Sequence, residues 1–203
     1  MKIICIGRNY VDHINELKNL IPTSPVVFLK PDSSIIPNKN PFIIPSFSNN
    51  IHFETELVFK IDKVGKHISE KFAHKYYSKF TLGIDFTARD IQDNLKNQSL
   101  PWEISKGFDG ATFVANKWFN VSDYNLDDIA FSLFKNDIQV QSAVSAQMIW
   151  KIDQLITYVS QFYTLKIGDI IFTGTPAGVG QVLNDDVLSG FIGSVKVFSL
   201  NVK

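Results

Sequence analysis

The sequence has one cysteine, no excess of charge of either sign and no long hydrophobic run. Cys5 cannot form an intramolecular disulfide, which is typical of a reducing compartment, and its apolar neighbours predict a core residue. Lysine plus arginine and aspartate plus glutamate number 20 each, so no net field attracts the chain to nucleic acid or an anionic membrane. The N-terminal apolar run is too short for a signal peptide or a membrane span. We therefore expect a cytoplasmic protein whose partner is a small molecule or another copy of itself.

What the chain does have is the composition of an ordinary globular protein, with 45% hydrophobic and 20% charged residues. Its 203 residues suit a single domain over 1–203, large enough to build a core without disulfides. The region 21–50 holds six of the eight prolines, with short apolar runs between them. We predict strands and turns there, and no linker, because no stretch rich in glycine, serine or charge interrupts it.

The stretch 51–59 alternates apolar and polar side chains, which predicts a strand with one buried face. Glu54 and Glu56 then point the same way, with their Cα atoms roughly 6.5–7 Å apart. The two carboxylates would repel each other, and a cation between them is the simplest resolution. Oxygen ligands with no cysteine or paired histidine nearby favour Mg²⁺, Mn²⁺ or Ca²⁺ over zinc. The alternative is that both glutamates lie on the solvated face of an antiparallel sheet.

A second candidate pair lies near the N-terminus. Residues 8–18 are predicted to form a helix with Asn9 as its N-cap. His13 and Glu16 are three residues apart on one face of that helix, so the carboxylate can orient the imidazole and stabilise its charge. This pair is a potential general base. The alternative is an exposed pair on a surface helix.

A third carboxylate stands at the end of a predicted strand. The apolar run 80–86 delivers Asp85, and Thr87 and Asp90 have the spacing of a capping box that opens a helix through Asn97. A junction between strand and helix is well suited to a third metal ligand. The alternative is that Asp85 is a turn or capping residue.

The remaining patterns predict a mainly β protein with a few helices. Lys106 is the cation of the segment 101–110, where a lysine is usually solvated. The segment 173–180 is rich in glycine and threonine, and its hydroxyl and N–H groups could hold a carboxylate. Apolar spacing predicts helices over 69–80 and 145–163. Strands are predicted at 26–29, 43–44, 112–114, 129–134 and 138–140, and alternating strand residues close the chain at 190–202.

Several short motifs occur in a fixed order along the chain. They are Ile6–Tyr10 with His13 and Glu16, Phe28–Pro31, His52–Leu57, Asp85–Gln92, Lys106 and Gly168–Pro176. Together they resemble the fumarylacetoacetate hydrolase family over nearly the whole chain. The resemblance is greatest to its short, single-domain branch of acylpyruvases and oxaloacetate decarboxylases. It implies an α+β fold, a mixed β-sandwich roll with flanking helices, and a homodimer.

The resemblance also implies residue roles. Glu54, Glu56 and Asp85 match the ligands of the family's Mg²⁺ or Mn²⁺, and Lys106 matches the cation beside the metal. A further pair, His13 with Glu16, matches the dyad that activates water, on a segment that acts as a lid in relatives. The positions that match substrate-binding or site-lining polar groups are Arg8, Arg89, Gln92 and Thr175.

The activity that the resemblance implies is metal-dependent cleavage of a C–C bond in acylpyruvate-type 2-oxo acids through a metal-chelated pyruvate enolate. The same site could decarboxylate oxaloacetate, and the intact His13–Glu16 pair favours hydrolysis. Two alternatives stay open. One is an isomerase or tautomerase of unsaturated 2-oxo diacids from aromatic catabolism, and the other is a metal- or ligand-binding protein without turnover.

Overall fold

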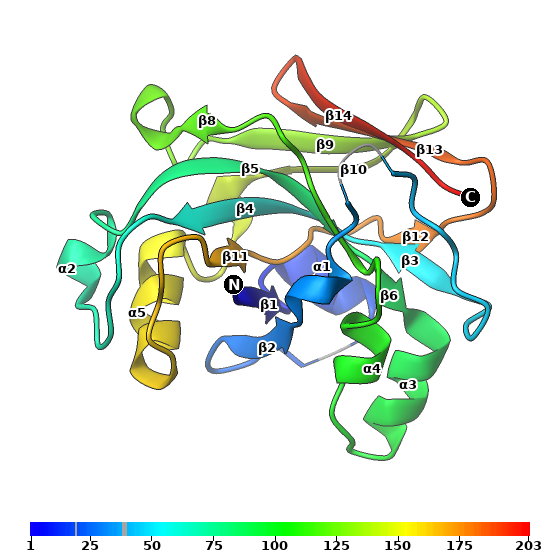
Figure 1. Cartoon of the computed structure of the whole chain (residues 1–203), viewed down its shortest axis with the longest axis horizontal. Helices are drawn as coiled ribbons and strands as arrows, with labels where there is room; N and C mark the ends of the chain where they lie inside the picture. Colours follow the sequence, from blue (N-terminus) through cyan, green and yellow to red (C-terminus); the bar gives the residue numbers. More distant parts are fainter. Residues whose placement is uncertain (19, 38–39) are drawn as a thin grey trace.

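The computed structural model describes residues 1–18, 20–37 and 40–203, and its largest sheet runs through the middle of the molecule (Figure 1). Its strands are β1 (Ile3–Gly7), β2 (Val26–Lys30), β4 (Thr55–Ile61), β5 (Tyr77–Asp85), β7 (Thr112–Val114), β8 (Phe119–Asn120) and β11 (Ile170–Phe172). The order is β2-β1-β11-β4-β5-β7, with β8 paired to β5. Because β1 and β11 run parallel and their neighbours antiparallel, the sheet is mixed.

A second sheet has the strands β9 (Ala130–Lys135), β10 (Ile138–Val144), β13 (Val187–Ile192) and β14 (Val195–Asn201). It is antiparallel in the order β10-β9-β13-β14, and it lies above the long curved strands β4 and β5 in Figure 1. A small third sheet joins β3 (Ile51–Phe53), β6 (Thr87–Ala88) and β12 (Gly180–Gln181). Strands from distant parts of the chain therefore pair in all three sheets.

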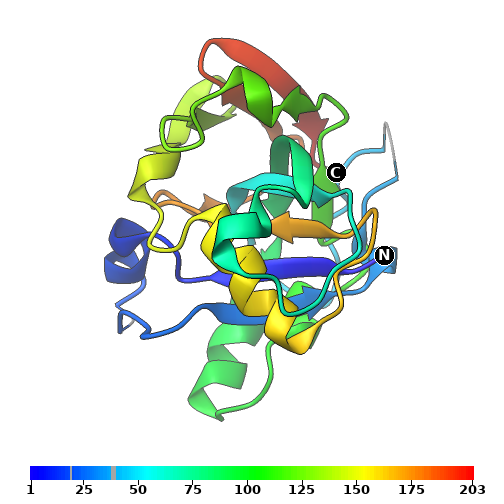
Figure 2. The same cartoon turned by 90° about the vertical axis from the view of Figure 1, so that its left-hand side faces the viewer.

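Five short helices flank the sheets. They are α1 (Val11–Glu16), α2 (Glu70–Ala73), α3 (Arg89–Asn97), α4 (Glu103–Lys106) and α5 (Ile152–Phe162). Helices α3 and α4 lie side by side at one end of the molecule, whereas α2 and α5 lie together at the other (Figures 1 and 2). None of the helices in the described residues has both the length and the apolar character that a membrane span requires. The expected fold class, mainly β with flanking helices, is confirmed.

Strand β4 is the most enclosed part of the main sheet. Six of its seven residues are buried, and only Lys60 is exposed, so both faces of the strand are covered. The alternation of the sequence had predicted one buried face, and the second sheet is the reason that the other face is covered as well. Any polar side chain that β4 carries near its start is therefore placed inside the protein.

The predicted helix over 69–80 is wrong except for one turn. Helix α2 ends at Ala73, and β5 begins at Tyr77. The spacing of Phe72 and Phe80 suggested a helix, but Phe72 is 44% exposed while Phe80 is fully buried in the sheet. Pairing of β5 with β4 supplies more buried contact than a surface helix could, so tertiary packing overrides the local pattern.

Other expected elements are shorter than predicted. The helix expected over 8–18 is limited to α1, whose N-cap is Tyr10 and not Asn9. The helix over 145–163 is a 3₁₀ turn at Ser145–Gln147 followed by α5. The strand at 43–44 does not form, because the pairing there is a single bridge from Phe42 to Val202. The predicted strands at 26–29, 112–114 and 129–134 are confirmed within about two residues, whereas the strand predicted at 138–140 continues to Val144.

The end of the chain is a hairpin. The stretch expected to contain strand residues at 190–202 holds the end of β13 and all of β14, which pair antiparallel from Ile192 and Val195 outward. Strand β13 in turn pairs with β9, which places the hairpin inside the second sheet. The C-terminal segment is thus part of the layer that covers β4 and β5.

Phe80 packs against three aromatic rings, with centroid distances of 5.8 Å to Phe59, 5.6 Å to Phe119 and 5.1 Å to Tyr124. We expect Phe80→Ala to lower the free energy of unfolding by about 3–5 kcal/mol, because the cavity cannot collapse between paired strands. Phe72→Ala is the matched control and should cost less than about 1 kcal/mol. Urea unfolding of both variants measures the difference, and equal losses would contradict this account of the core.

Candidate metal centre and active site

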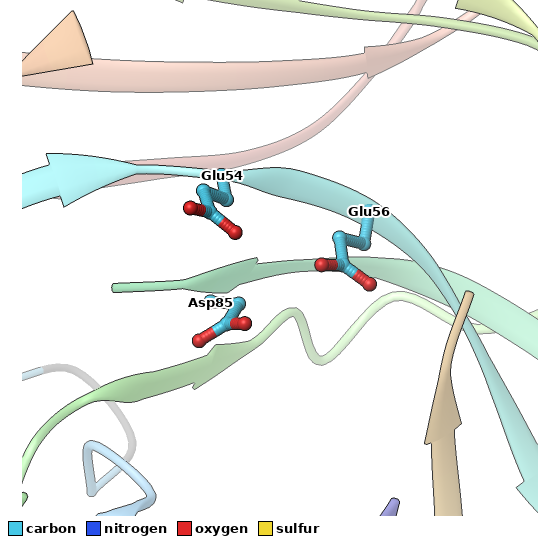
Figure 3. Close-up of side chains that lie close together, drawn as sticks. All are labelled: Glu54, Glu56 and Asp85. Atoms are coloured by element: carbon cyan, nitrogen blue, oxygen red, sulfur yellow. The ribbon is translucent and has the colours of Figure 1, made fainter. Parts of the chain in front are cut away.

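Three carboxylates meet where β4 and β5 lie side by side (Figure 3). Glu54 precedes β4, Glu56 is its second residue, and Asp85 is the last residue of β5. The N–H of Asp85 donates to the carbonyl of Glu54 at 2.8 Å, which sets the two chain segments in register. One carboxylate oxygen from each residue lies within 4.8 Å of the others. The structure thus brings the three expected metal ligands together.

All three carboxylates are buried, with exposures of 5% for Glu54, 2% for Glu56 and 1% for Asp85. The alternatives of a solvated strand face and a surface turn are therefore wrong. Within the described residues, Glu56 pairs with no lysine or arginine, and its carboxylate accepts the N–H of Gly174 at 2.6 Å. Burial and the charges of Asp85 and Glu54 raise its pKa well above the usual value. A hard divalent cation fits this all-oxygen set because it would neutralise the repulsion.

Lys106 lies at the centre of the cluster. Its Nζ is 2.8 Å from an oxygen of Glu54 and 2.8 Å from one of Asp85, and it donates to the Thr87 hydroxyl at 2.6 Å. Burial would lower the lysine pKa, but the charges of Asp85 and Glu54 outweigh that effect and raise it. The alternative of a solvated lysine is therefore wrong, and Lys106 is a fixed positive charge.

A second buried lysine was not predicted. Lys30, at the end of β2, places Nζ 2.5 Å from Asp85 Oδ1 and 2.6 Å from the carbonyl oxygen of Ala111. Its sequence signal is a lysine that ends an apolar strand immediately before Pro31, a position where burial follows from the strand. Asp85 thus has a cation on each carboxylate oxygen.

Thr87 has a different partner from the one that its sequence pattern suggests. The predicted capping box with Asp90 is wrong, since α3 has Ala88 as its N-cap and no side-chain cap. The Thr87 hydroxyl donates to Glu54 at 3.0 Å, and Asp90 accepts from Ser48 at 2.6 Å. The cluster offers Thr87 two charged partners, Glu54 and Lys106, which a helix cap would not.

Arg89 and Gln92 extend the site from the first turn of α3. The Arg89 guanidinium donates to Glu54 Oε1 and, at 2.5 Å, to Gln92 Oε1. Burial alone would raise the pKa of Glu54, but Lys106 and Arg89 hold it well below the usual range. The two glutamates therefore differ, since the pKa of Glu54 is lowered by its cationic partners and that of Glu56 is raised by burial and by its acidic neighbours.

The His13–Glu16 pair is present and faces the same cavity as the carboxylates. His13 Nδ1 lies 3.1 Å from Glu16 Oε2, and His13 is 6% exposed. Burial lowers the histidine pKa, although Glu54 and Glu16 oppose the shift. A neutral imidazole beside a carboxylate can accept a proton at neutral pH. The alternative of an exposed surface pair is wrong for the histidine, which is buried.

The loop 173–180 holds carboxylates, as its glycines and threonines suggested, but they belong to the protein itself. The N–H of Gly174 donates to Glu56, and that of Gly178 donates to Glu16 at 3.0 Å. Both glycines have φ of 96°, and a Cβ at Gly178 would lie 2.0 Å from the carbonyl oxygen of Val140. Only glycine can place these two donors without strain.

Thr175, from the same loop, is held by the backbone and by a second residue that was not predicted. Its hydroxyl donates to the carbonyl of Thr55 at 2.9 Å and accepts from Gln141 Nε2 at 2.9 Å. Gln141 also accepts the N–H of Thr55 at 3.0 Å, so it joins β4 to the loop. No local signal marked Gln141, which sits in a strand pattern on β10.

One cavity collects nearly all the predicted residues. Glu16 does not line the cavity itself, but it contacts His13, which does. Leu17, Lys96 and Trp102 also line the cavity, although none of the three was predicted. The predicted residues that line it directly are Arg8, His13, Glu54, Glu56, Asp85, Arg89, Gln92, Lys106 and Thr175.

Comparison with known proteins agrees with the resemblance that the sequence motifs indicated. A family model described as fumarylacetoacetate (FAA) hydrolase C-terminal matches residues 2–196. An oxaloacetate tautomerase of Bos taurus, described as mitochondrial, is 38% identical over 192 residues, which cover 94% of this chain and 87% of the relative. An oxaloacetate decarboxylase of Dictyostelium discoideum, also described as mitochondrial, is 42% identical over 193 residues, covering 92% and 86%.

The fold is also similar to that of solved structures. The crystal structure of fumarylpyruvate hydrolase from Pseudomonas aeruginosa, in complex with Mn²⁺ and pyruvate, has a TM-score of 0.92 and 31% identity to this chain. The superposition covers 100% of this chain and 89% of the other. The expected similarity to short members of one enzyme family is confirmed.

The raised pKa of Glu56 predicts that metal binding depends on pH. A divalent cation must displace the proton of Glu56, so Mn²⁺ affinity should fall about tenfold per pH unit below that pKa and level off above it. Glu56→Gln should weaken binding by more than about 100-fold and remove the pH dependence. Calorimetric Mn²⁺ titrations measure both effects, with the exposed Glu70→Gln as control. Unchanged affinity in Glu56→Gln would show that the metal lies elsewhere.

Proposed function

The chain belongs to the fumarylacetoacetate hydrolase family, and on that premise we propose that it is a divalent-metal-dependent enzyme that acts on 2-oxo acids. One observation carries the proposal: the buried His13, paired with Glu16, faces the same cavity as Glu54, Glu56 and Asp85. A protein that only stored a metal or a ligand would gain nothing from a neutral base beside its carboxylates. Catalysis is therefore preferred to the alternative without turnover.

Glu54, Glu56 and Asp85 would hold Mg²⁺ or Mn²⁺. When bound, the ion supplies Lewis-acid polarisation of the oxygens of the 2-oxo acid. The all-oxygen donor set supports this assignment, as does the Mn²⁺ in the related fumarylpyruvate hydrolase structure. Choosing between Mg²⁺ and Mn²⁺ requires a measurement on the purified protein.

The other residues act on the substrate. Lys106 is pinned by Glu54, Asp85 and Thr87, so its charge stays where negative charge develops on the keto oxygen as an enolate forms. Gln92 and Thr175 supply polar groups at the wall of the cavity. Arg89 orients Gln92 and keeps Glu54 ionised. These are positioning and electrostatic roles, and none of them requires a covalent intermediate.

With oxaloacetate, the proposed reaction is tautomerisation. His13 takes a proton from carbon 3, the C–H electrons form the carbon–carbon double bond, the C=O π electrons move to the keto oxygen, and that oxygen takes the proton from the His13 imidazolium to give the enol. Glu16 stabilises the imidazolium during the transfer. The relatives named oxaloacetate tautomerase and oxaloacetate decarboxylase, at 38% and 42% identity, favour oxaloacetate as the substrate.

Hydrolysis of an acylpyruvate is the second candidate, and it was the reaction favoured by the sequence. His13 removes a proton from water, the hydroxide adds to the distal carbonyl, and the bond to carbon 3 breaks to give a carboxylic acid and pyruvate. The same dyad and the related fumarylpyruvate hydrolase favour this reaction. In both candidate reactions, negative charge develops on the same keto oxygen.

Assays with the purified protein separate the candidates. Oxaloacetate tautomerisation is followed by the ultraviolet absorbance of the enol, and acylpyruvate cleavage by release of pyruvate, each with Mg²⁺, with Mn²⁺ and with EDTA. Turnover that EDTA abolishes supports the proposal. Absence of turnover with every substrate in the presence of either metal would overturn it. The homodimer and the cytoplasmic location stay predictions.

We expect His13→Ala to slow turnover by roughly 10²–10⁴-fold, because the base is lost, while Mn²⁺ affinity stays nearly unchanged. His74→Ala is the control, since His74 is exposed at the end of α2. Steady-state rates and a calorimetric titration measure the two effects. Loss of Mn²⁺ binding in His13→Ala would mean that the histidine is a ligand and not the base.

A further inference from the structure

Two cations at the cavity are not used by the carboxylate cluster. Lys106 and Arg89 pair with the presumed ligands, whereas Arg8 and Lys96 line the same cavity without contacting them. Within the described residues, Arg8 forms no ion pair, and Lys96 has one, to the exposed carboxylate of Asp93 at 3.8 Å. The cavity lining therefore carries positive charge in addition to what balances the acidic cluster.

A single indole ring holds both cations. Arg8 Cζ lies 5.7 Å and Lys96 Nζ 5.6 Å from the centroid of Trp102. Trp102 is itself fixed, because it packs edge-on against Phe28 at 6.1 Å. The two positive groups, from segments about 90 residues apart in the sequence, are thus both held against one packed ring.

The backbone of Arg8 and the charges around Lys96 both indicate a place where an anion binds. Arg8 has φ of 58°, a left-handed conformation that is rare outside glycine and that persists where the surroundings enforce it, often at binding sites. Partial burial and the charge of Arg89 lower the pKa of Lys96 to about 8, and Arg8 adds to this repulsion. An anion bound beside the two cations would relieve the repulsion between their charges.

We propose that Arg8 and Lys96 bind a second carboxylate of the substrate, with Trp102 as the wall that positions them, so that the site selects 2-oxo dicarboxylates over acylpyruvates with an uncharged distal end. The inference rests on the proposed function for the position of the oxo-acid end. That end lies at Glu54, Glu56 and Asp85, and the distal end at the indole. Lys96 is then a specificity-determining residue.

A structural explanation competes with this one. Lys96 could serve only to cover Trp102 with its stem and to pair with Asp93. In that case its loss would affect all ligands equally or none of them. A comparison of two ligands that differ only in the distal charge therefore separates the two explanations.

The experiment compares oxaloacetate with 2-oxosuccinamate, its analogue with a distal carboxamide. Equilibrium binding is measured by protein fluorescence in the presence of Mg²⁺, and turnover is measured separately. The wild-type protein should prefer oxaloacetate. Lys96→Met should weaken oxaloacetate binding roughly tenfold or more and change 2-oxosuccinamate binding less than about twofold, because one charge-assisted hydrogen bond is lost. Lys96→Arg should retain most of the preference.

The controls keep the result interpretable. Oxalate lacks a distal group, so unchanged oxalate binding shows that Lys96→Met is folded and that its metal end is intact. Lys63→Met removes another lysine held over an aromatic ring, 5.2 Å from Tyr76 and outside the cavity, and should change nothing. Arg8→Met should act like Lys96→Met.

The two hypotheses fail separately. Equal affinity of the wild-type protein for both ligands, or an equal loss for both in Lys96→Met, overturns the distal carboxylate site even if turnover is present. A preference for oxaloacetate that is lost in Lys96→Met, in a protein without turnover of any substrate, supports the distal site and overturns the proposed function.

Discussion

Mutual repulsion among three buried carboxylates is the constraint on which the rest of the site depends. Glu54, Glu56 and Asp85 lie too close together and too far from water to remain ionised without compensation. The compensation comes from three separate elements, since Lys30 ends β2, Arg89 begins α3 and Lys106 ends α4. This charge balance joins the edge of the main sheet to both helices at that end of the molecule.

The charges are not balanced at Glu56, and this imbalance favours the binding of a metal ion. Glu56 receives a backbone N–H where the other two carboxylates receive cations, so it is the ligand at which a bound metal has most to neutralise. The loop that supplies this N–H also anchors Glu16 through Gly178, and thereby helps to orient His13. A base and a metal site that shared one loop would keep their relative position, which the proposed proton transfer at a substrate between them requires.

The cavity lining holds two sets of charges. One is the carboxylates with their buried cations, and the other is Arg8 and Lys96 against Trp102. A substrate bound as proposed would meet a divalent ion at its oxo-acid end and positive side chains at its distal end. The relatives are named for three reactions, as tautomerase, decarboxylase and hydrolase. We infer that all three pose one chemical problem, which is to hold an enolate next to a base.

The sequence by itself determined what depends on local spacing and residue chemistry: most of the strands, the helix after Asp85, and the identity of the acidic cluster and the His13–Glu16 pair. The tertiary structure alone decided that 77–79 belong to a strand and not to a helix, that Asn9 bonds the backbone of Thr173 and Trp150, and that Thr87 and Lys30 face the carboxylates. The reason is physical. In each case the deciding partner lies outside the local segment, and a buried polar group or paired strand gains more from that partner than from its neighbours in sequence.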